Sequence, residues 1–109
     1  MARQLSNGTY ADQVYVTEAY TPVGSHTVVN DLSAAVTLTR PAGATMIAIQ
    51  AGGQNVRLTF DGTTPTSGAS GVGFKVLADA PVAIFSVSGP SVKVIQEAPT
   101  ANLQYQWMA

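Results

Sequence analysis

The chain has 109 residues, of which five are basic and six acidic, so the formal net charge is −1 with the single histidine neutral. This length fits one domain. Charged residues make up only 10% of the chain, and a typical soluble protein has about a quarter. The absence of cysteine excludes disulfides, thiolate zinc sites and cysteine nucleophiles. The nearly even charge balance also disfavours nucleic acid as the main partner.

The N-terminal segment differs in character from the rest of the chain. Residues 1–11 are mostly polar and contain no apolar run of the kind found in a secretory signal. We expect them to form an arm outside the core, with residues 12–109 as a single domain. Gly, Pro, Asn and Gln interrupt every apolar stretch before it reaches the roughly 18–20 residues that cross a bilayer, so we expect no membrane partner.

Short runs rich in Val, Ile, Thr and aromatic residues, separated by Gly and Pro, predict β-strands. The first is expected over residues 12–20, where apolar residues alternate, and a turn at residues 21–24 should end it. Residues 26–39 have some helical spacing, but their many β-branched side chains favour two strands around a turn at Asn30-Asp31.

The middle of the chain continues the same pattern. The run Ala44–Ile49 is apolar on both faces, as expected of a central strand or of a strand at an interface. Residues 54–60 alternate, which predicts a half-buried antiparallel strand. Residues 61–71 contain no large apolar residue, so we expect a mobile surface loop. Further strands are expected over residues 73–77, 81–87, 91–96 and 101–107.

About nine short strands at roughly ten-residue spacing predict an all-β domain, an antiparallel sandwich or a barrel. The chemistry of a catalytic site is sparse. The one imidazole, His26, has no carboxylate partner near it in sequence, and the chain has no Gly-x-Ser-x-Gly elbow. Turn positions account for Asp31, Asp61 and Asp79. We therefore expect no enzymatic activity, cofactor or metal; a pair of carboxylates that meet in space from distant strands is the alternative.

Two regions are candidates for contact with a partner. Tyr105 and Trp107 alternate on one face of the last strand, where they either pack in the core or form a binding face, because aromatic residues are enriched at interface hot spots. The loop after residue 60 offers an adaptable polar surface. Its candidate contact residues are Asp61, Thr63, Thr64, Pro65, Thr66 and Ser67.

The segment from Ala44 to Tyr105 resembles small β-rich virion proteins of tailed bacteriophages. The resemblance rests on a buried strand ending in Ile49-Gln50, an alternating strand through Asn55-Val56-Arg57, the loop Asp61-Gly62-Thr63-Thr64-Pro65-Thr66 and the closing strand. It covers a little over half of the chain. The turn before Pro81 departs from the pattern, with Asp79 where glycine is more usual.

The resemblance implies an antiparallel β-sandwich of jelly-roll type that decorates or cements a capsid. Such a protein would bind the major capsid protein on the outer capsid surface of the virion after its synthesis in the host cytoplasm. A head–tail connector, neck or tail component is the alternative, and a carbohydrate-binding module on a virion surface is a third. The two-sided apolar character of residues 44–49 and 82–87 further predicts a homodimer or homotrimer.

Overall fold

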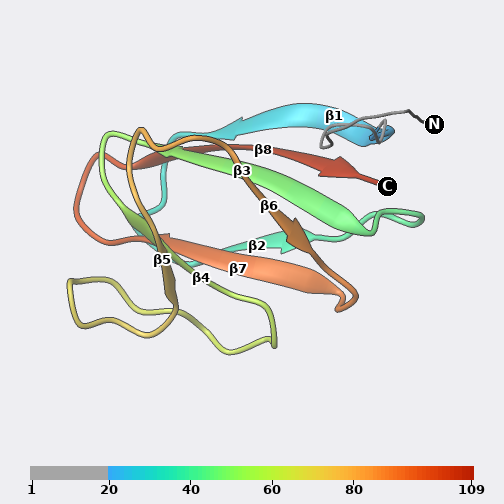
Figure 1. Ribbon diagram of the computed structural model, residues 1–109. Coiled ribbons are helices and arrows are strands. Elements are labelled where there is room, and N and C mark those ends of the chain that lie inside the picture. The colour runs from blue at the N-terminus through green and yellow to red at the C-terminus, as the bar shows by residue number, and fades with distance from the viewer. Residues whose placement is uncertain (1–19) are drawn as a thin grey trace, which may run out of the picture.

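The computed structural model describes residues 20–109, which form two antiparallel four-stranded sheets and no helix (Figure 1). The expected all-β class is confirmed. The predicted arm, and the predicted strand before Tyr20, lie outside the described residues. The strands are β1 (Pro22–Val29), β2 (Val36–Thr39), β3 (Met46–Gly52), β4 (Val56–Thr59), β5 (Phe74–Val76), β6 (Ala83–Ser86), β7 (Ser91–Gln96) and β8 (Asn102–Met108).

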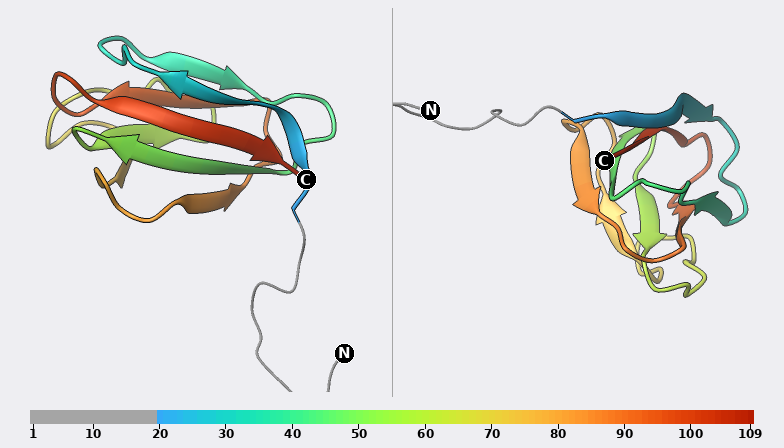
Figure 2. Two further views of the ribbon diagram at one scale, coloured as in Figure 1. Left: turned by 90° about the horizontal axis from the view of Figure 1, so that it is seen from above. Right: turned by 90° about the vertical axis from the view of Figure 1, so that its right-hand side faces the viewer.

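The two sheets are built from nested pairs of strands. Sheet A has the order β1-β8-β3-β6, and sheet B has the order β2-β7-β4-β5. The first strand thus pairs with the last, the second with the seventh, the third with the sixth, and the fourth with the fifth. The pairs β3–β8 and β4–β7 complete the sheets. Figure 2 shows the resulting two layers from two further directions.

Alternate residues of each sheet face a common core. Ile47 and Ile49 of sheet A and Val92 and Val94 of sheet B are fully buried in one cluster, as expected when two sheets pack face to face. Trp107 belongs to the same cluster. β3 is central in its sheet, which agrees with its two-sided apolar sequence.

The predicted turn at residues 21–24 is wrong. Pro22 and Val23 pair with Met108 and Trp107, so β1 begins there. Proline is tolerated because it is the first residue of an edge strand and needs no donor on its free side. Gly24, at φ 79°, lies where the register shifts, so it forms an irregularity inside the strand rather than a turn before it.

The turn predicted at Asn30-Asp31 is confirmed, because β1 ends before it and the Asp31 carboxylate accepts a hydrogen bond from the Ser33 amide at 3.0 Å. At the other end of β1, Thr21 and Ala109 exchange two backbone hydrogen bonds. Within residues 20–109 no helix is long and apolar enough to cross a membrane.

Candidate functional site

Exposed apolar side chains gather along one side of the molecule. Seven large hydrophobic residues among residues 20–109 are exposed, and five of them lie in or beside β5 and β6, which form one edge of each sheet. They are Val72, Phe74, Leu77, Val82 and Ile84. Phe74 is the most open, with 70% of its surface exposed. Solvent-exposed apolar surface gathered in this way is typical of an interaction site.

At Phe74 the core itself reaches the surface, whereas Ile84 points outward from sheet A. Phe74 pairs in register with Leu58, which is fully buried, so both side chains stand on the inner face of sheet B. Phe60 links the two sheets, because its ring lies 6.1 Å from that of Phe74 and 5.2 Å from that of Phe85 on β6. No further strand covers Phe74 among the described residues, since β5 ends its sheet.

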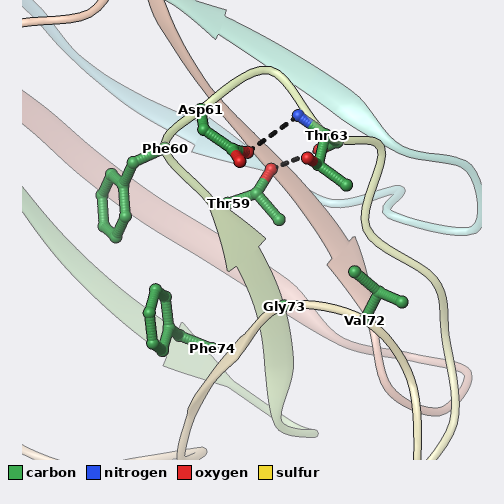
Figure 3. Close-up of a pocket in the computed structure, with 7 residues that line it drawn as sticks. All are labelled: Thr59, Phe60, Asp61, Thr63, Val72, Gly73 and Phe74. Atoms are coloured by element: carbon green, nitrogen blue, oxygen red, sulfur yellow. Dashed lines mark hydrogen bonds between the residues drawn. The ribbon is translucent and has the colours of Figure 1, made fainter.

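A pocket of about 470 Å³ opens beside this aromatic group (Figure 3). We call it the Phe60–Phe74 pocket. The two rings line one part of it, and the turn after β4 and the return of the chain into β5 line the rest. Its lining residues are Thr59, Phe60, Asp61, Thr63, Val72, Gly73 and Phe74. The volume lies in the range of ligand-binding pockets, and the mainly apolar lining suits an aliphatic or aromatic group.

The polar rim of the pocket is a tight turn. The Asp61 carboxylate accepts a hydrogen bond from the Thr63 amide at 3.0 Å, and the Thr59 hydroxyl donates to the Thr63 carbonyl. The hydrogen bonds from the backbone and side chain of Thr63 hold the pKa of Asp61 below its ordinary value. The carboxylate is therefore charged near neutral pH, and it is already engaged in holding the turn.

The loop after β4 lies at the surface, as expected, but it is anchored to the sandwich. Pro65 is fully buried, although it is small. The Thr66 amide donates to the Val72 carbonyl at 3.1 Å, and the Gly68 amide donates to the Glu97 carbonyl at 3.0 Å. The loop is thus packed against the sandwich. Sequence reasoning missed this because it counted large apolar side chains and not a buried proline.

A charged network also holds this loop. Arg57, on the outer face of β4, donates to the Gly73 carbonyl at 2.9 Å and to the Ala69 carbonyl at 2.5 Å. Its guanidinium lies 3.2 Å from the Glu97 carboxylate, which also pairs with Lys75 at 3.4 Å. Both side chains of the Arg57–Glu97 pair are nearly buried. The network therefore connects the loop to both β4 and the end of β7.

Competing influences set the pKa of Glu97. Loss of solvent is the largest and raises the pKa, but the Asn55 amide, the Lys75 ammonium and the Arg57 guanidinium together lower it below its ordinary value. Glu97 is thus ionised in the folded protein at neutral pH.

The predicted contact residues of the last strand and those of the loop after β4 differ in their exposure to solvent. Trp107, only 5% exposed, lies in the core, which is one of the two alternatives that the sequence left open for it; the half-buried Tyr105 packs against the same core. Pro65 is also buried and offers no contact surface. Of the loop residues, those that stay exposed are Asp61, Thr63, Thr64, Thr66 and Ser67. Asp61 and Thr63 are the two that line the Phe60–Phe74 pocket.

Sequence reasoning missed the apolar part of the site. Phe60, Val72 and Phe74 lie in segments predicted as strand or loop, but the sequence does not say that β5 ends its sheet and leaves Phe74 open. The sequence feature that could have indicated this site is the pair Phe60 and Phe74, which flanks the only Thr/Ser/Gly-rich loop of the chain.

Within residues 20–109 no three His, Asp or Glu side chains are grouped as metal ligands would be. The exposed His26 lies on sheet A with its Nε2 atom 2.9 Å from Gln104 Oε1. The Phe60–Phe74 pocket thus combines an apolar hollow with a hydrogen-bonded rim, which suits binding of a protruding apolar side chain. No protein family, curated protein or solved structure was found to match the chain.

Proposed function

We propose that this protein is a structural component of a phage virion, a decoration or cement protein that binds the major capsid protein on the outer surface of the capsid. The observation that carries the proposal is the open apolar side formed by β5, β6 and the Phe60–Phe74 pocket, with Phe74 70% exposed. Large aromatic residues in the centre of a contact supply much of the binding energy of an interface.

A jelly-roll topology belongs to the same proposal. Jelly rolls have eight strands in two sheets. The strand orders β1-β8-β3-β6 and β2-β7-β4-β5 support it, because they arise when one long hairpin, with the first strand beside the last, is folded over into two layers. This topology is common in capsid proteins and also in lectins, so it does not by itself select a function.

Each bound copy is proposed to contribute a small amount to the stability of the capsid. A protruding apolar side chain of the capsid protein enters the Phe60–Phe74 pocket, and the ordered Asp61–Thr63 turn supplies a polar rim. Each copy stabilises only the assembled state that it binds, and many copies across a shell raise the stability of that shell by mass action. Such a protein needs neither catalysis nor a cofactor.

We also propose that copies associate as a dimer or trimer. The register places Met46, Ala48, Ile84 and Met108 on the outer face of sheet A, and none of them is charged. An interface built there would desolvate few charges. Sedimentation velocity of the purified protein tests this self-association. A monomer at micromolar concentration would refute it and would leave the capsid-binding proposal unaffected.

Co-sedimentation with capsids that lack this protein tests the capsid-binding proposal. The wild-type chain is expected to sediment with them and to raise their disruption temperature. Phe74→Ser should bind at least tenfold more weakly, because it removes the exposed ring and leaves the fold nearly intact. Val28→Ser is the matched control, because Val28 is 50% exposed and lies on β1, at the edge of sheet A opposite β6. This variant should bind as wild type. Sedimentation with neck or tail assemblies instead would support the alternative location.

A further inference from the structure

A second pocket, of about 420 Å³, lies at the end of sheet A where β3 ends and β8 begins. We call it the amide pocket. Unlike the Phe60–Phe74 pocket it has a mainly polar lining, and its rim includes the turn between β5 and β6. Its lining residues are Gln50, Ala51, Gly52, Gly53, Asp79, Asn102 and Gln104.

The amides in this pocket are held in fixed orientations. Gln50 Nε2 donates to the Ala80 carbonyl at 3.1 Å, and Gln104 Oε1 lies 2.9 Å from His26 Nε2, which is placed to donate to it. These contacts use the donor end of one glutamine and the acceptor end of the other. The Gln50 oxygen, the second N–H of Gln50 and the two N–H groups of Gln104 therefore remain for a ligand. They lie close together because the two residues are register partners on β3 and β8.

The backbone around the amide pocket is strained. Among residues 20–109 only Asp79 and Thr100 have a positive φ without being glycine, at 58° and 75°. Asp79 lines the pocket, and the Thr100 carbonyl would lie 2.6 Å from a Cβ added to Gly53. A Cβ on Gly52 would come within 2.7 Å of Asn102 Oδ1. Strained residues that persist in a fold cluster at functional sites, and here Asp79 lines the pocket.

Asp79 is also the residue that stands in the turn before Pro81 where glycine is more usual. Aspartate tolerates the left-handed conformation better than most residues, but glycine adopts it at no steric cost. The chain therefore keeps a carboxylate at the rim of the pocket in a position where glycine would relieve strain.

The chemistry of the lining selects the ligand. No Lys or Arg lines the pocket, and the Asp79 carboxylate would repel an anion. One carboxylate is too few for a tight divalent-cation site. An apolar ligand would leave the amides unpaired, at a cost in free energy. A hydroxyl both donates and accepts, so it satisfies amides and a carboxylate together.

We propose that the amide pocket binds a neutral saccharide, with hydroxyl groups paired to Gln50, Gln104, Asn102 and Asp79. This site is distinct from the Phe60–Phe74 pocket and does not rest on capsid binding. A virion protein with such a site would hold a glycan at the particle surface, but the isolated chain suffices to test it.

The test is an NMR titration of the full ¹⁵N-labelled chain with the methyl glycosides of glucose, galactose, mannose and N-acetylglucosamine, each to tens of millimolar, in EDTA. At least one is expected to shift the amides of residues 50–53, 79, 102 and 104 in a saturable way. The double variant Gln50→Ala/Gln104→Ala should weaken that binding at least tenfold, and Asp79→Asn, which keeps the left-handed backbone accessible, at least threefold. Gln54→Ala, an exposed glutamine outside the pocket, is the control and should bind as wild type.

Three results would overturn the proposal. The first is that none of the four glycosides shifts these amides. The second is that the shifts map to Phe60 and Phe74 instead. The third is that calcium chloride or inorganic phosphate alone, in the absence of EDTA, produces the same shifts, which would identify an ion site. Spectra of the unliganded variants with wild-type dispersion would establish that a loss of binding does not come from unfolding.

Discussion

Replacing Arg57 with methionine tests whether the charged network holds the loop between β4 and β5. The change keeps an unbranched side chain of similar reach and removes the guanidinium. It takes away the donors to the Gly73 and Ala69 carbonyls and leaves Glu97 with Lys75 as its only cation among the described residues.

The magnitude follows from the burial of these groups. The Arg57 side chain is only 12% exposed, and an acceptor left without its donor in such a place costs about 1–3 kcal/mol. The Ala69 carbonyl is exposed and can turn to water, so we expect a total loss of about 2–3 kcal/mol in the free energy of unfolding. For a domain of this size that loss lowers the melting temperature by roughly 10–20 °C.

Two measurements check this prediction. Thermal unfolding is followed by the fluorescence of Trp107, the single tryptophan and a buried one. Hydrogen exchange reports the amides of Thr66 and Gly68, which should lose protection well before the core strands. Lys93→Met is the control, because Lys93 lies on β7 of the same sheet and makes no ion pair within residues 20–109. If Arg57→Met melts like Lys93→Met and the loop amides keep their protection, the anchoring role of the network is refuted.

Two further predictions concern the same region. Gly71→Ala places a Cβ 2.0 Å from the Thr66 carbonyl oxygen, so we expect a loss of about 1–3 kcal/mol by urea unfolding, and a midpoint equal to that of the neighbouring Ser70→Ala would contradict it. Glu97 has a lowered pKa in the fold, so its stabilisation is present above its ordinary pKa of 4.5 and is lost as the pH falls through the folded value. Wild-type stability should therefore fall more steeply below about pH 4.5 than that of Glu97→Gln, and parallel pH profiles would count against this.

Local patterns in the sequence were enough to place most strands. The runs around Ile49, Arg57 and Val94 carry the alternation or the two-sided apolar character of strands, and the structure has strands there. The start of β1 was missed because Pro22 and Gly24 are turn formers in most contexts. Only the pairing with β8 reveals that they lie on an edge strand, where both are tolerated.

The candidate site was less predictable because exposure depends on tertiary structure. Trp107 and Phe74 are both aromatic residues in alternating strands, yet Trp107 lies on the inner face of a strand with neighbours on both sides and Phe74 lies on the last strand of its sheet. Strand order comes from pairings between distant segments. The same limit applies to the amide pocket, which brings together residues 50–53, 79 and 102–104.

A density map of capsids reconstituted with this chain tests the proposed function most directly. We expect density for the eight-stranded sandwich on the outer capsid surface, with the side formed by β5 and β6 against the major capsid protein and Phe74 buried in that contact. Density confined to the neck or tail, or a capsid-bound sandwich with Phe74 facing solvent, would contradict it.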